Sequence, residues 1–175
     1  LSSANLEKAD LSRATLVYAD LSRSKMAGAN LTSASALKTN FLGADLSGAV
    51  LREANLSESD LQEAVLVKAD LRKAVLRGAQ AGKANAVEAD LDEADLSKFA
   101  GNRGADFSRA KIRNAQGDQS IWSDAKLEQT DFSGSRLARA NFVSAVLKRS
   151  NLSFTDLRYA RFDDAVLEGA NMTKT

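Results

Sequence analysis

Large apolar residues recur at every fifth position along the chain, and the residue two places before each is small. Taking the large residue as i, 20 repeats run from Leu1 to Leu96 and 15 from Asn102 to Met172. Of these 35 central positions, 30 hold Leu, Phe, Met, Ile or Trp, and all 34 preceding i−2 positions hold Ala, Ser or Thr. The stretch ANLSESDLQEAVLVKADLRKAVLRGA (residues 54–79) shows the pattern with Leu56, Leu61, Leu66, Leu71 and Leu76.

A period of five fits neither an α-helix nor a straight strand. Helical residues five apart differ by about 140° around the axis, so no apolar stripe would form. In a strand, i−2 and i share one side, but the next inward position, i+3, would face the other side. The chain must therefore turn once per repeat, and with corners near 90° four repeats close a coil of 20 residues. We predict an all-β, four-sided β-helix of eight to nine coils, forming a single domain over residues 1–175.

The residue types suit this geometry. Leu and Phe side chains meet near the axis, while the i−2 residue lies under a corner with room for little more than Ala, Ser or Thr. Asn or Asp at i−1 is short enough to accept hydrogen bonds from the turn backbone. Positions i+1 and i+2 face water and carry most of the charged residues, so they are the positions available to a partner.

The register slips once, because Leu96 and Asn102 are six residues apart. One extra residue is predicted within SKFAG (residues 97–101), looping out of the coil and exposing Phe99. Assigned to four columns, Ala81, Asn102 and Trp122 stack together, so the indole is expected to fill volume that its smaller neighbours leave. The central positions without a large apolar side chain are Ala36, Ala81, Ala86, Asn102 and Gly117.

Repeats such as EADLDEADL (residues 88–96) follow the motif A(D/N)LXX, and on this motif the chain resembles the pentapeptide-repeat family over essentially its whole length. The resemblance implies a right-handed quadrilateral β-helix, and it supplies the handedness, which the spacing does not. It also implies two functional hypotheses. One is a non-enzymatic scaffold or protein-interaction module; the other is a DNA mimic that binds the topoisomerase gyrase and protects it from quinolones. The fold does not decide between them.

Charge favours the first hypothesis. A DNA mimic needs carboxylates along the rod in place of phosphates. The chain has 24 Lys and Arg against 23 Asp and Glu, and the four columns sum to −2, +1, 0 and +2, so no column is continuously acidic. We expect a protein partner, no direct binding of nucleic acid and no membrane association, since no apolar run approaches the roughly 20 residues that span a bilayer.

Enzyme chemistry finds no support in the residues. His and Cys are absent, which removes imidazole bases, thiolates and the usual zinc ligands. The acidic run Asp90, Asp92, Glu93 and Asp95 offers oxygen ligands to a cation, but Asp90 and Asp95 simply occupy the i−1 position, so we interpret the run as a solvated face. We predict no catalytic, cofactor or metal site. The lack of cysteine is compatible with a cytoplasmic location and leaves an extracytoplasmic or lumenal one open.

Three surface features are candidate partner contacts. The first is the slip, with Phe99. The second is the outward pair Phe154 and Tyr159, and the third is Leu37 with Leu42, both at outward i+1 positions. Because stacked coils leave unpaired backbone groups at each end, we also expect an end-to-end homodimer or a flanking domain to cover an open end.

Overall fold

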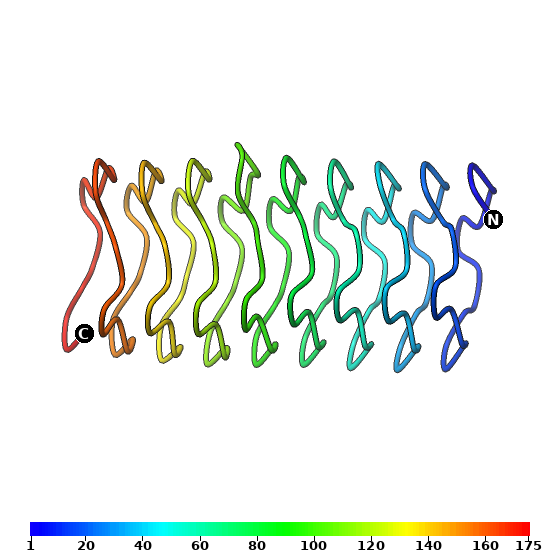
Figure 1. Cartoon of the computed structure of the whole chain (residues 1–175), viewed down its shortest axis with the longest axis horizontal. Coiled ribbons are helices and arrows are strands. Elements are labelled where there is room, and N and C mark those ends of the chain that lie inside the picture. Colours follow the sequence, from blue (N-terminus) through cyan, green and yellow to red (C-terminus); the bar gives the residue numbers. More distant parts are fainter.

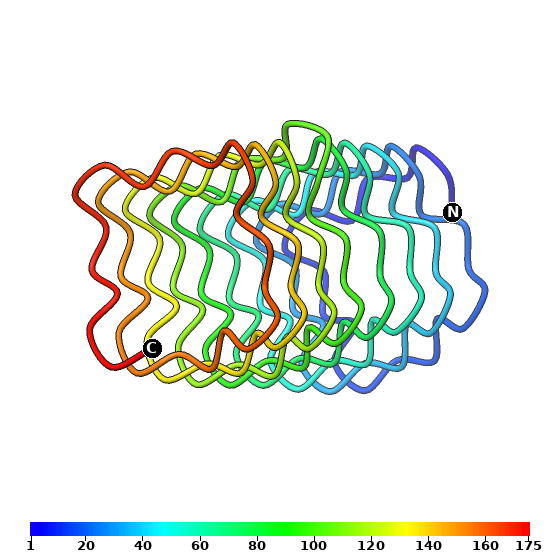
Figure 2. The same cartoon turned by 60° about the vertical axis from the view of Figure 1, so that its left-hand side comes forward.

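The computed structural model describes all 175 residues and winds them into one rod of stacked coils (Figure 1). It contains no helix and no extended strand. Instead, the i−1 residue of each repeat forms a single parallel β-bridge with the repeat one coil further on, from Asn5 paired with Lys25 to Asn151 paired with Asn171. The second view shows the coils stacked in register around a common interior (Figure 2). Four repeats per coil are therefore confirmed, and the four faces of the rod arise from the period of five.

In one repeat, Leu56 to Asp60, each of the five backbone amides donates a hydrogen bond. The amides of Leu56 and Glu58 donate to the following coil, at 2.7 and 2.9 Å, and that of Asp60 donates to the preceding coil at 3.0 Å. The amide of Ser59 closes the corner by donating to the carbonyl of Leu56 at 3.1 Å. The fifth amide, that of Ser57, donates to the side-chain oxygen of Asn55 at 3.1 Å. Asn or Asp at i−1 thus satisfies the only amide that the backbone ladder leaves free.

Every corner but the one at residues 102–104 has the same backbone conformation. At each regular corner only the i+2 residue has a positive φ, which is 56° at Lys8 and 54° at Glu58, as in a type II turn. Glycine usually occupies such positions, but 29 of the positive φ values here belong to other residues. The ladder of bonds on both sides of the corner must therefore supply the energy that holds these residues in the left-handed region.

We number the faces by their first central residue, so that the first to fourth faces begin at Leu1, Leu6, Leu11 and Leu16. The central residue of every repeat from Leu16 to Leu152 is buried, and so are the i−2 residues from Ser24 to Thr155, whereas Ala14 and Ala19 are half-buried. The i+1 and i+2 side chains point outward at the corner that follows each face. This core fixes the positions of the outward side chains from which a binding surface can be built.

The extra residue lies in a corner of the coil, directly after the predicted segment 97–101. Bridges are 20 residues apart up to Gln80 with Ala100 and 21 apart from Asn85 with Asp106 onward, until Asp106 with Lys126 restores 20. Gly101, not Asn102, takes the central position, because its amide donates to the carbonyl of Ile121 in the next coil. The corner therefore contains three residues, Asn102 to Gly104, and its loop projects from the rod (green in Figures 1 and 2).

This enlarged corner closes with a different turn. The amide of Ala105 donates to the carbonyl of Asn102 at 3.1 Å, and both residues between them have positive φ, 54° at Arg103 and 82° at Gly104. Two successive positive values define a type I′ turn, for which glycine at the second position is the ordinary choice. The faces are not rotated by the insertion, because the chain re-enters the ladder at Ala105 and Asp106.

The prediction that Phe99 is exposed is wrong: its side chain is 1% exposed. Phe99 occupies an i−2 position, so one such position does hold a large residue, and the adjoining central residue is Gly101. A Cβ at Gly101 would lie 2.8–2.9 Å from the rings of Phe99, Phe107 and Trp122. In this repeat the large residue is at i−2 and the small one at the centre, the reverse of the usual order. The small residue that leaves volume for the Trp122 indole is therefore Gly101, where Asn102 was predicted.

Candidate protein-interaction surface

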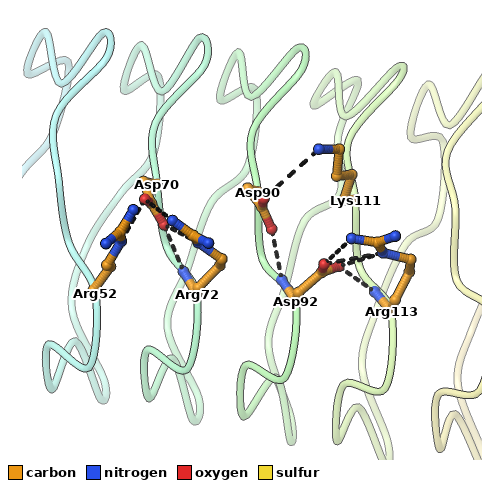
Figure 3. A network of polar contacts seen from close by, with 7 residues as sticks. All are labelled: Arg52, Asp70, Arg72, Asp90, Asp92, Lys111 and Arg113. Carbon is orange, nitrogen blue, oxygen red and sulfur yellow. Dashed lines mark hydrogen bonds and ion pairs between the residues drawn. The ribbon is translucent and has the colours of Figure 1, made fainter.

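A ladder of ion pairs runs along the third face (Figure 3). Asp70 accepts hydrogen bonds from Arg72 in its own coil, at 2.7 and 2.9 Å, and from Arg52 in the preceding coil at 2.6 Å. One coil further, Asp92 accepts from both the side chain and the backbone amide of Arg113. The sign of the charge changes from one coil to the next, so each carboxylate lies against a cation rather than another carboxylate.

These contacts change the titration of Asp70. The Arg72 guanidinium, assisted by Arg52, lowers the pKa of the Asp70 carboxyl to about 2, and partial burial opposes the shift. The side chain of Asp70 is only 19% exposed, whereas those of Arg72 and Arg52 are about half exposed. The network therefore keeps a charged carboxylate at the middle of the third face over the whole neutral range.

The acidic run predicted at Asp90 to Asp95 does not gather its four carboxylates. Asp90 faces Lys111 at 3.9 Å, Glu93 faces Lys73 at 3.7 Å and Asp95 lies on the fourth face, where it accepts from Arg77 at 2.7 Å. No group of three or more Asp or Glu side chains is arranged to hold an ion. The acidic side chains of this run are solvated, pair with cations of neighbouring coils and are divided between two faces.

A hollow lies at the corner after the third face. Its volume is about 400 Å³, and it crosses four coils. A neighbouring depression of about 260 Å³ shares Glu93 with it and continues toward Arg52. We call the larger one the corner hollow; its lining residues are Asp92, Glu93, Arg113, Asn114, Ser133, Gly134 and Phe154.

The predicted aromatic pair is exposed. Phe154 is 61% exposed and Tyr159 80% exposed, on the corners of the third and fourth faces. Each ring has a cation over it: Lys174 Nζ lies 5.1 Å from the Phe154 centroid, and Arg139 lies 5.8 Å from that of Tyr159. Phe154 alone belongs to a cavity, so the structure separates two residues that the sequence treats alike.

The other predicted contacts differ in exposure. Leu37 and Leu42 are half-buried at successive corners. A further exposed ring, Tyr18, was not among the predicted contacts; it is 71% exposed and lies under Lys38 at the same corner as Tyr159. Tyr18 and Tyr159 both occupy an i+2 position, so the rule that i+2 side chains point outward predicts exposure for both.

Successive coils carry opposite net charge through much of the rod. Residues 21–40 have three basic and no acidic side chains, residues 41–60 have one basic and four acidic, and residues 61–80 have four basic and two acidic. The alternation continues with two basic and five acidic side chains in residues 81–100, then four basic and two acidic in residues 101–121. Ten of the 13 ion pairs accordingly join adjacent coils. The alternation cancels within each column, so the column totals of charge stay close to zero.

The fold defines a class: a β-solenoid of four-sided coils. Comparison with known proteins agrees. The family model for pentapeptide repeats, in eight copies, matches residues 1–32, 39–78, 120–153 and 145–175. The chain belongs to the pentapeptide-repeat family, and its fold is the right-handed quadrilateral β-helix.

Solved structures supply two relatives. The chain is 32% identical to HetL, a pentapeptide repeat protein involved in heterocyst differentiation regulation in the cyanobacterium Nostoc, over 98% of this chain and 86% of HetL, with a TM-score of 0.49. It is 20% identical to QnrB1, a plasmid-mediated fluoroquinolone resistance protein, over 93% of this chain and 86% of QnrB1, with a TM-score of 0.50. At that identity the likeness to QnrB1 concerns the fold alone. A comparison with curated protein sequences gave no match.

Proposed function

We propose that the chain is a non-enzymatic interaction module, a rigid rod whose outward side chains bind a protein partner. One observation carries this proposal. The inward side chains are buried and nearly all backbone amides are hydrogen-bonded within the rod, while the i+1 and i+2 side chains differ from coil to coil. The central residues from Leu16 to Leu152 are all buried, whatever their type. Solenoids of stacked repeats typically bind partners through such extended outer surfaces.

The chemistry of the surface supports the same proposal. The corner hollow contains no pair of groups suited to proton transfer, since Asp92 is held by Arg113 and the chain has no histidine. No helix is present that has the length and apolar character to cross a bilayer. We therefore assign the outward residues to recognition and none to a reaction.

Affinity capture from cells of the native source tests the proposal. The immobilised rod is compared with a variant in which Phe154, Tyr159 and Arg139 are replaced by serine, after circular dichroism has shown that both fold alike. We expect at least one protein that the native rod retains and that rebinds when purified. A result in which the rod retains no more protein than an unrelated solenoid would overturn the assignment.

The alternative, a gyrase-binding DNA mimic, receives less support from the charges. Basic coils interrupt the acidic ones, and on the third face Asp92 lies against Arg113. A supercoiling assay with gyrase, with and without a quinolone, separates the hypotheses: a mimic would change either activity or drug inhibition, and an unrelated interaction module changes neither. Coverage of the terminal coils by a second copy or a flanking domain stays a prediction, which sedimentation velocity tests.

A further inference from the structure

The corner hollow exists because one i+2 side chain is missing from the column that lines it. This column reads Glu93, Asn114, Gly134 and Phe154 in successive coils. Gly134 has a φ of 71°, and a Cβ built on it would lie 2.5 Å from Asn114 Oδ1. The carboxamide of Asn114 therefore lies against Gly134, in the position that a Cβ would take, and the rest of an i+2 side chain is absent at this level.

The ring of Phe154 forms one end of the hollow. Lys174 covers the ring from the following coil, with Nζ 5.1 Å from the centroid. Stacked corners place Gly134, which has no side chain, on the side of the preceding coil. With 61% of the residue exposed, the ring offers its π-electrons to a further cation.

Glu93 supplies the other end of the hollow. Of the two acids in the lining, Asp92 is neutralised by Arg113, which donates from its side chain and from its backbone amide. Glu93 faces only Lys73, at 3.7 Å with both side chains 58% exposed, and a pair so exposed binds weakly. The lining thus has two acidic side chains and one basic side chain, and Glu93 is the carboxylate held only by an exposed pair.

We propose that the corner hollow binds a basic, arginine-containing segment of a protein partner. One guanidinium stacks on the free face of Phe154 and a second cationic side chain pairs with Glu93. Arginine suits both ends because its planar guanidinium stacks on rings and donates to carboxylates. The proposal rests on the function proposed above and specifies the chemistry of the partner.

The dimensions indicate how far apart the two cations lie. Glu93 and Phe154 are three coils apart, which is about 14 Å at the ~4.8 Å spacing of neighbouring chains in a β-ladder. An extended peptide rises about 3.3 Å per residue, so basic residues four positions apart span about 13 Å. An extended segment with arginines at positions i and i+4 would therefore reach both ends.

Fluorescence anisotropy of a labelled peptide, Gly-Arg-Gly-Ser-Gly-Arg-Gly, tests this inference with the full chain at low ionic strength. We expect saturable binding that Phe154→Ala and Glu93→Gln each weaken about two- to five-fold, in line with the loss of an exposed cation–π contact or charge pair. A peptide with both arginines replaced by glutamate should not bind.

Two variants are matched controls. Tyr159→Ala removes an exposed ring that also lies under a cation, Arg139, but lines no cavity, and Glu58→Gln removes an exposed carboxylate paired with Lys38 on another corner. Both should leave peptide binding unchanged. A peptide that binds Phe154→Ala as tightly as the native rod, or Tyr159→Ala as weakly as Phe154→Ala, would overturn the inference, as would no binding at about 1 mM.

The capture experiment distinguishes this inference from the proposed function. A captured partner that also binds the Phe154→Ala and Glu93→Gln variants undiminished would refute the corner hollow as its site and leave the interaction module standing. A rod that captures nothing refutes the module, whatever the peptide does.

Discussion

Two regions of the rod have coils of the same shape but differ in the side chains that fill the interior. In the leucine segment, residues 44–78, every central residue is Leu and every i−2 residue is Ala or Ser. In the aromatic segment, residues 99–142, Phe107, Trp122, Phe132 and Phe142 fill the interior, with neighbouring ring centroids 5.2–6.5 Å apart. The larger rings fit because Gly101 adds no side chain beside three of them, whereas the space that Gly117 leaves is filled by Leu137. The backbone ladder therefore sets the shape of the coil, and the core has only to conserve its volume.

The largest effect is expected in the leucine segment from Leu66→Lys. Leu66 is 2% exposed, so the substitution buries an unpaired charge, and we expect a loss of more than about 4 kcal/mol in the free energy of unfolding. Circular dichroism and chemical unfolding measure it. Val67→Lys, at the adjoining outward position, is the control and should fold. A stable, β-rich Leu66→Lys protein would show that the interior tolerates charge.

In the aromatic segment, Gly101→Ala tests the volume argument. The added methyl group would lie within 2.9 Å of three buried rings, and overpacking of this kind costs about 1–3 kcal/mol. Gly82→Ala, one coil earlier at an i+1 position covered by the side chains of Asn102 and Arg103, has its nearest neighbour at 3.3 Å, the side-chain oxygen of Asn102, and should cost less. Equal melting temperatures for the two variants would contradict the packing described.

Asp70→Asn removes the ion pairs of the third face while keeping the shape of the side chain. The pKa of Asp70 is about 2 in the folded protein, below the ~3.9 of an unfolded chain, so its stabilising effect is present above about pH 4 and lost as the pH falls through 2. Allowing for the exposed arginines, we expect a loss of about 1–2 kcal/mol at pH 7.

Urea unfolding of the native chain and of Asp70→Asn between pH 2 and pH 7 measures this difference. It should shrink as the pH falls, because protonation of Asp70 removes the same charge. Asp45→Asn is the control, since Asp45 accepts from Ser47 and has no arginine partner. A difference for Asp70→Asn that is constant with pH would exclude the ionic explanation.

Ser59→Ala should have the smallest effect and the opposite sign. The buried hydroxyl of Ser59 has no hydrogen-bond partner, and alanine is the usual residue at this position, so the variant should gain about 0.5–1 kcal/mol. Ser135→Ala should instead lose about 1 kcal/mol, because Ser135 donates to the carbonyl of Ile112 and accepts from the amide of Ala115. Thermal unfolding that gave both variants the same sign would refute this distinction.

The sequence predicted the coil because its rules are local and repeat 35 times. It misplaced the extra residue because neither Gly101 nor Asn102 is apolar, so the spacing allowed either at the centre, and because Phe99 violates the rule of small i−2 residues. Only the ladder of bridges decides between them. Phe154 was recognised as outward from its position in the repeat. Its distinction from Tyr159 depends on Gly134 one coil away and on the direction of side chains, which the period does not encode.

The corner at Asn102 to Gly104 shows how such a rod tolerates a change in length. The added residue protrudes, and the chain then resumes its former alignment, with Asp106 bridging to Lys126 twenty residues later. Lengthening is absorbed locally and is not transmitted to the next coil. An epitope or a protease cleavage sequence grafted between Arg103 and Gly104 would therefore protrude from the rod, while the coils on either side keep their hydrogen bonds.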